Sequence, residues 1–137
     1  MESLLLATAL IEAGAGLFLL WAPSFFARLL LGVPLASGAT LTVARIGGTG
    51  VLALGLAARF ASADAHSCAA RGLVGAMVLY NLGAATLLGA AVCQPAAHPT
   101  VLWLGVALHA AMATWCVVCL RTTNPPLTIS FKSSTPS

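Results

Sequence analysis

Four long apolar stretches constrain this chain more than any other feature of its sequence. They run over residues 3–22, 39–61, 72–93 and 100–120. Each has about the 20 residues that an α-helix needs to cross about 30 Å of hydrocarbon. Of the 137 residues, 60% are hydrophobic and 7% are charged, and the mean hydropathy is +1.01, far from the balance of a soluble domain. The sequence therefore predicts a multi-pass integral membrane protein.

The apolar stretches favour helices over a transmembrane β-barrel. They are rich in Ala, Leu, Gly and Val and hold no segments of about ten residues with alternating hydrophobicity. The connections at 62–67 and 94–99 are short and polar, which is typical of antiparallel neighbours. We therefore expect an all-α integral membrane four-helix bundle, with antiparallel neighbours and short loops, as one domain over residues 1–121.

Two segments lie outside the predicted spans. Pro23 ends the first span, because proline lacks an N–H and disfavours helix in the residue before it. Residues 24–32 are too short to cross a membrane and are expected to lie at the interface, with Arg28 among the head groups. Residues 122–137 are rich in proline and hydroxyl side chains, so we expect a flexible cytoplasmic tail.

The distribution of basic residues predicts the orientation. Four spans place both termini on one side of the membrane. Arg59, Arg71, Arg121 and Lys132 lie on that side, and Arg28 is the basic residue outside the spans on the other side. The positive-inside rule therefore predicts that both termini are cytoplasmic.

Each predicted span carries a strongly polar residue, and these are Glu12, Arg45, Asn81 and His109. Counted from the non-cytoplasmic ends at about 1.5 Å per residue, the four depths fall within about one side-chain length of each other. A charge at the bilayer centre costs about 2.5–3.5 kcal/mol on insertion scales, so such residues face the bundle interior and find partners. We expect Glu12 and Arg45 to form an ion pair, with Asn81 and His109 satisfying the remaining donors and acceptors.

Small and hydroxyl residues accompany these polar residues at helical spacing. The stripes include Thr8 and Gly16 beside Glu12, and Thr42, Gly48 and Thr49 beside Arg45. Small residues allow close helix approach in lipid, so these faces are expected to pack inward. Tyr80 points about 100° away from Asn81 around the helix, so we expect its hydroxyl to face a neighbouring helix instead of the same cavity.

The polar layer of Glu12, Arg45, Asn81 and His109 has two interpretations. In the first it is structural, and the buried charges fix register and topology. In the second it lines a pocket for a small ligand, or a proton relay in which Glu12 or His109 titrates. The common depth of the four residues is the feature that distinguishes them from ordinary buried polar side chains.

The remaining motifs point to no redox, metal or nucleic-acid function. Cys116 and Cys119 form a C-x-x-C at the end of the last span, where the helix dipole opposes a thiolate. They could bind a metal with His66 and Cys68 only if the loop folded back, so we expect no metal and no cofactor. The net charge of +3 is too small and dispersed to indicate nucleic-acid binding.

The stretch "ARIGGTGVLALGLAARF" at residues 44–60 has an early arginine followed by a glycine-rich face. With the chain length and the four spans, it resembles the small DoxX-like four-helix membrane proteins of bacteria. The runs "RGLVGAMVLYN" and "LHAAMATWCVVCL" also look like small bacterial membrane proteins. This resemblance implies a four-helix membrane fold in a bacterial inner membrane and implies little chemistry.

The sequence lacks a nucleophile elbow, a phosphate-binding glycine loop outside the spans and an H-E-x-x-H motif, and we assign no catalytic residue. We expect an accessory or scaffolding membrane subunit with a structural polar layer. The alternative is a carrier or enzyme for a small lipid-soluble molecule that uses Glu12, Arg45, Asn81 and His109. The expected partner is the lipid bilayer, and a homo-oligomer or a partner membrane protein stays open.

Overall fold

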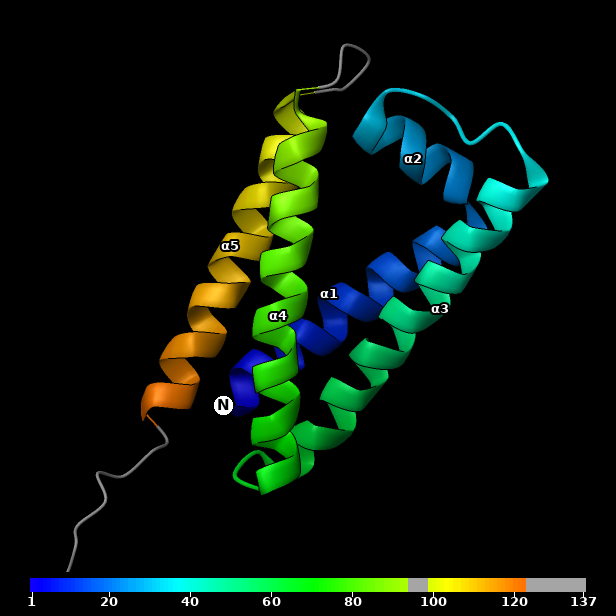
Figure 1. The fold of residues 1–137 in the computed structure, drawn as a ribbon. Coiled ribbons are helices and arrows are strands. Elements are labelled where there is room, and N and C mark those ends of the chain that lie inside the picture. The colour runs from blue at the N-terminus through cyan, green and yellow to red at the C-terminus, as the bar shows by residue number, and fades with distance from the viewer. Residues whose placement is uncertain (94–98, 123–137) are drawn as a thin grey trace, which may run out of the picture.

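The computed structural model describes residues 1–93 and 99–122, and it is helical through most of them (Figure 1). The elements are α1 (Glu2–Trp21), α2 (Pro23–Leu31), α3 (Gly38–Ala61), the 3-10 turn η1 (Ser62–Asp64), α4 (Cys68–Ala91) and α5 (Pro99–Thr122). The helices α1, α3, α4 and α5 are long and apolar enough to cross a membrane, which confirms the four predicted stretches as helices. The predicted tail, apart from Thr122, lies outside the described residues.

Local capping explains where the helices begin and end. Pro23 occupies the first turn of α2, where its missing N–H costs nothing, and Gly32 ends that helix in the left-handed conformation at φ 78°. The Ser37 hydroxyl accepts a hydrogen bond from the backbone N–H of Thr40 at the start of α3. Ser67 caps α4 in the same way, so α4 begins at Cys68 and not at residue 72 as predicted.

The long helices form two antiparallel pairs. α1 packs against α3, and α4 packs against α5, whereas contacts between the pairs are fewer (Figure 1). The short helix α2 contacts α1, α3 and α5 and lies across the end where the pairs diverge. The arrangement is therefore open at one end and not uniformly packed along its length.

Close backbone contact holds α1 and α3 together. A Cβ atom added at Gly16 would lie 2.5 Å from the backbone nitrogen of Leu52 and 2.8 Å from the carbonyl oxygen of Gly48. A Cβ added at Gly55 would lie 2.6 Å from the backbone nitrogen of Ala13. Glycine is required at these positions because the two backbones touch.

The two pairs meet in a buried apolar cluster near the N-terminus of α1. Its members come from all four long helices and include Leu4, Leu5, Ala58, Val74, Met77 and Cys116. These residues lie in the first half of α1 and α4 and the second half of α3 and α5. The other halves of the pairs lie farther apart, and this separation leaves space inside the molecule (Figure 1).

Candidate functional site

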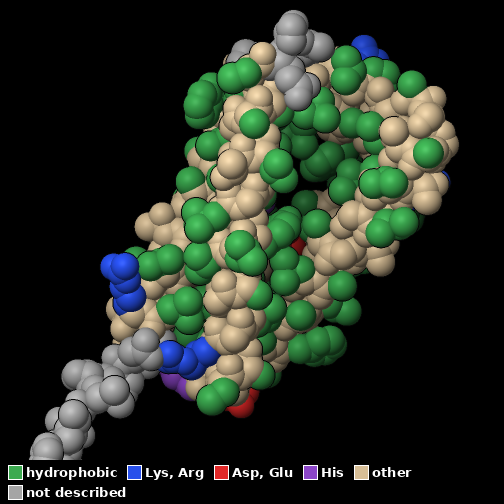
Figure 2. All heavy atoms as spheres, in the orientation of Figure 1, with side chains coloured by type: hydrophobic (Ala, Val, Ile, Leu, Met, Phe, Trp, Pro, Cys, Tyr) green, Lys and Arg blue, Asp and Glu red, His purple; other side chains and the backbone are tan. Residues whose placement is uncertain are grey.

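A cavity of about 460 Å³ lies between the two helix pairs, on the side of the apolar cluster toward α2. Its wall combines residues of all five α-helices, namely Ile11, Glu12, Ala15, Leu19, Phe26, Leu30, Val51, Tyr80, Ala84, Leu87, Leu88, Gly105, Leu108 and His109. Figure 2 shows the molecule hollowed between α4 and α3, with hydrophobic and acidic atoms visible in the hollow. The volume falls in the range of about 300–1,000 Å³ that is typical of small-molecule sites.

Glu12 and Tyr80 connect the two pairs across this cavity. The Tyr80 hydroxyl on α4 donates a hydrogen bond to Glu12 Oε2 on α1 at 3.1 Å. The Glu12 side chain is buried, with 3% of its surface exposed. The Tyr80 hydroxyl contacts a neighbouring helix, α1, as expected, but the expectation that it lies outside the cavity of the polar layer is wrong. A helix with neighbours on two sides buries two flanks, so consecutive residues of α4 can both reach the interior.

His109 and Asn81 form a second hydrogen-bonded pair, between α5 and α4. His109 Nδ1 lies 2.8 Å from Asn81 Oδ1, and Asn81 Nδ2 donates to the carbonyl oxygen of Met77 at 2.9 Å. The Met77 carbonyl can only accept, so the amide nitrogen must face it and the amide oxygen must face the histidine. His109 Nδ1 therefore carries the hydrogen of this bond, and Nε2 is the remaining ring nitrogen.

The rings of Tyr80 and His109 join these two pairs into one group. Their centroids are 5.8 Å apart and their planes are inclined by 81°, an edge-to-face arrangement. Glu12, Tyr80, Asn81 and His109 thus form a contiguous set, which we call the polar cluster. Three of its members, Glu12, Tyr80 and His109, line the cavity, and Asn81 is fully buried behind them.

Arg45 is not part of the polar cluster. Its side chain is exposed on α3, and within residues 1–93 and 99–122 it forms no ion pair with Glu12. The predicted ion pair is therefore wrong. The backbone of α3 approaches α1 closely at Gly48, Leu52 and Gly55, and this contact fixes the rotation of α3 so that Arg45 lies on an outer flank.

The threonines near Arg45 on α3 are also exposed at the surface. Thr42 and Thr49 are exposed, and their hydroxyls donate to backbone carbonyls one turn earlier in α3. The predicted inward stripe of α3 is thus wrong for Thr42, Arg45 and Thr49 and correct for Gly48. On α1 the corresponding stripe of Thr8, Glu12 and Gly16 is buried, as predicted.

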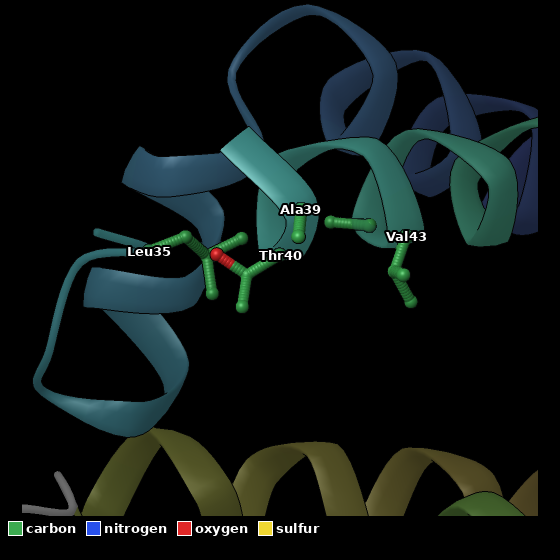
Figure 3. Close-up of a pocket in the computed structure, with 5 residues that line it drawn as sticks. Leu35, Ala39, Thr40 and Val43 are labelled. Carbon is green, nitrogen blue, oxygen red and sulfur yellow. The ribbon is translucent and has the colours of Figure 1, made fainter. Parts of the chain in front are cut away.

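A second hollow and the cysteines offer fewer groups that could bind a ligand or react. The hollow, of about 410 Å³, lies where the loop before α3 meets its first turns, lined by Leu35, Ala39, Thr40, Val43 and Ala44 (Figure 3). Its hydroxyl, on Thr40, is already bonded to Ser37 in the helix cap. The four cysteines are free thiols, and the described parts of the chain hold no group of three or more residues placed to bind a metal.

The geometry at the polar cluster is suited to binding a molecule that is mostly apolar. A carboxyl group and an imidazole in one cavity could also serve acid–base chemistry, because these are the side chains most often used for it. No protein-family model, curated protein or solved structure matches this chain. The function is therefore argued from the site itself.

Proposed function

We propose that this protein is a membrane-embedded binding protein for a small, mostly apolar molecule, either as a carrier or as part of an enzyme. The observation that carries the proposal is the apolar cavity of about 460 Å³ with Glu12, Tyr80 and His109 in its wall. Such cavities bind ligands through apolar contact and use a few polar groups to fix orientation. The ligand would enter from the bilayer, where apolar molecules concentrate.

The unused hydrogen-bonding capacity of the polar cluster supports binding over a purely structural role. The second carboxyl oxygen of Glu12 and Nε2 of His109 have no hydrogen-bond partner in the described part of the chain. A polar layer that served packing alone would be expected to satisfy these atoms internally. Asn81, by contrast, uses both ends of its amide and supports His109 from behind.

A second candidate function is that of a subunit in a larger membrane assembly, and the exposure of Arg45 favours it. Arg45 lies within a helix that could span the membrane and has no carboxylate partner among the described residues. The chain has three acidic residues: Glu12 is bonded to Tyr80, whereas Glu2 and Asp64 lie at the opposite end of the helices. A carboxylate on another membrane protein would satisfy Arg45. Loss of a copurifying protein in an Arg45→Gln variant would test this candidate.

We further propose that the four long helices cross the membrane with both termini in the cytoplasm, in a bacterial inner membrane as the DoxX-like resemblance implies. Arg59, Arg71 and Arg121 lie at one end of the helices, which supports this orientation. Cys68 begins α4 and Cys93 follows its end, and both are exposed. A membrane-impermeant maleimide added to intact cells should therefore label Cys93 and spare Cys68, in variants that keep one cysteine each.

The binding proposal is tested by the small molecules that copurify with the protein. Mass spectrometry of protein extracted from native membranes should detect a bound apolar compound. Ala84→Leu fills the cavity and should remove the compound, whereas Ala76→Leu, on an exposed part of the same helix, should retain it. Equal recovery from both variants would contradict binding in the cavity.

A further inference from the structure

We propose that the ligand carries a protonated amine, which binds between Glu12 and His109 while its apolar body fills the cavity. This inference rests on the proposed binding function and names the chemical class of the ligand. It follows from an inventory of donors and acceptors in the wall of the cavity, and from the charges of the surrounding residues.

His109 offers the cavity an acceptor. The Asn81 amide is oriented by its bond to the Met77 carbonyl, so its oxygen faces His109 Nδ1 and requires a hydrogen there. In the neutral imidazole the second nitrogen, Nε2, is then a lone-pair acceptor. A ligand that approaches Nε2 must bring a hydrogen-bond donor.

Glu12 also offers an acceptor. The Tyr80 hydroxyl has one hydrogen, and its bond to Glu12 Oε2 uses it. The other carboxyl oxygen has no partner in the described residues. The cavity therefore presents acceptors from α1 and α5, and the hydroxyl that could donate between them is already engaged.

The charges around the cavity distinguish an amine from a neutral donor. The wall contains one acidic residue, Glu12, and its described residues include no lysine or arginine. Arg45 lies on the outer flank of α3 and does not pair with Glu12. An ammonium group would stabilise the ionised form of the Glu12 carboxyl through a charge-assisted hydrogen bond. An alcohol would donate a hydrogen bond without supplying the charge.

The experiment compares three ligands that share one apolar chain and differ at the head group. Decylamine, decanol and decanoic acid are each equilibrated by dialysis with the protein in phosphatidylcholine nanodiscs at neutral pH, and binding to protein-free nanodiscs is subtracted. The amine should bind about tenfold more tightly than the alcohol, because charge-assisted hydrogen bonds are stronger than neutral ones. The acid should bind most weakly, since its charge has the sign of Glu12.

Glu12→Gln removes the charge and should lower the affinity for decylamine to that for decanol. Glu2→Gln is the matched control, because Glu2 is exposed at the start of the same helix and outside the cavity. If Glu12→Gln does not fold, the ranking of the three ligands on the unmodified protein decides the question alone.

The possible failures are distinguishable. If decanol or decanoic acid binds as tightly as decylamine, or if the amine preference survives in folded Glu12→Gln, the amine assignment is wrong and the cavity remains a binding site. If none of the three ligands binds above protein-free nanodiscs, the assignment and the proposed binding function both fail.

Discussion

The Tyr80 hydroxyl donates to Glu12 Oε2 at 3.1 Å and so connects α4 to α1. These two helices belong to different antiparallel pairs, which contact each other less than the helices within each pair do. The hydrogen bond therefore joins the two halves of the molecule at the wall of the cavity. It also takes the place of the ion pair that the sequence led us to expect for Glu12.

Replacing Tyr80 by phenylalanine tests this connection. Tyr80→Phe keeps the ring and removes the donor, so the free energy of unfolding should fall by about 0.6 kcal/mol, and by at most about 1.7, the range measured for hydrogen bonds between membrane helices. Thermal or denaturant unfolding in detergent measures the change. Glu12→Leu, which removes both acceptor oxygens, combined with Tyr80→Phe should show coupling between the two sites. Strictly additive effects would mean that the bond contributes nothing.

A second double-mutant cycle addresses Glu12 and Arg45. Because Arg45 is exposed and does not pair with Glu12, the coupling energy between Glu12→Gln and Arg45→Gln should be within about 0.5 kcal/mol of zero. The same unfolding assay applies. If the double variant recovers more than this of the stability lost in the single variants, Glu12 and Arg45 do interact. That result would contradict the orientation of α3 that places Arg45 on an outer flank.

Substitution of Asn81 should lower the stability of the protein. Asn81→Leu keeps the volume similar but leaves His109 Nδ1 and the Met77 carbonyl without this partner, and we expect a loss of about 1–3 kcal/mol in unfolding free energy. Thr86→Val is the control on the same helix, because the Thr86 hydroxyl is exposed and bonds within α4. It should change stability by less than about 0.5 kcal/mol. Equal effects of the two substitutions would argue against the Asn81–His109 pair.

Replacing each of two glycines one half-turn apart on α1 by alanine should change the stability of the protein in different ways. At Gly16 the added methyl group would meet the backbone of α3, so Gly16→Ala should cost about 1–3 kcal/mol of stability. At Gly14 no atom beyond the neighbouring residues and the helix's own backbone lies within 4 Å of the added carbon, so Gly14→Ala should be neutral or stabilise the helix by up to about 1 kcal/mol. Unfolding measurements on the two variants compare them directly. A tolerated Gly16→Ala would show that α1 and α3 are not in backbone contact.

Helix number and extent followed from the sequence because they depend on local properties. Apolar runs of the right length, together with Pro23 and Gly32, were sufficient to place α1, α2 and α3 to within one or two residues. The start of α4 was predicted at residue 72 because Arg71 was placed outside the apolar span. A charged residue can lie inside the first turns of a helix, and this helix begins at Cys68, after the Ser67 cap.

The polar cluster was predictable only in part. Helical depth alone identified Glu12, Asn81 and His109, since buried polar residues in apolar helices seek one another. Arg45 was misplaced because depth says nothing about rotation around the helix axis, and Tyr80 was excluded from the cavity because its offset of about 100° from Asn81 was taken to leave the inward side of α4. The rotation of α3 is set by its backbone contact with Gly16 of α1, which the sequence shows only as a small-residue pattern.

Photocrosslinking in membranes can show whether apolar molecules bind between the helix pairs. A decyl chain that carries a diazirine is used as the alcohol and as the amine, and the modified residues are mapped by mass spectrometry. We expect labels on cavity residues such as Ala15, Val51 and Ala84 that an excess of unlabelled ligand removes. Labels confined to outward-facing residues such as Leu79 and Leu104, and unaffected by the competitor, would contradict binding between the helix pairs.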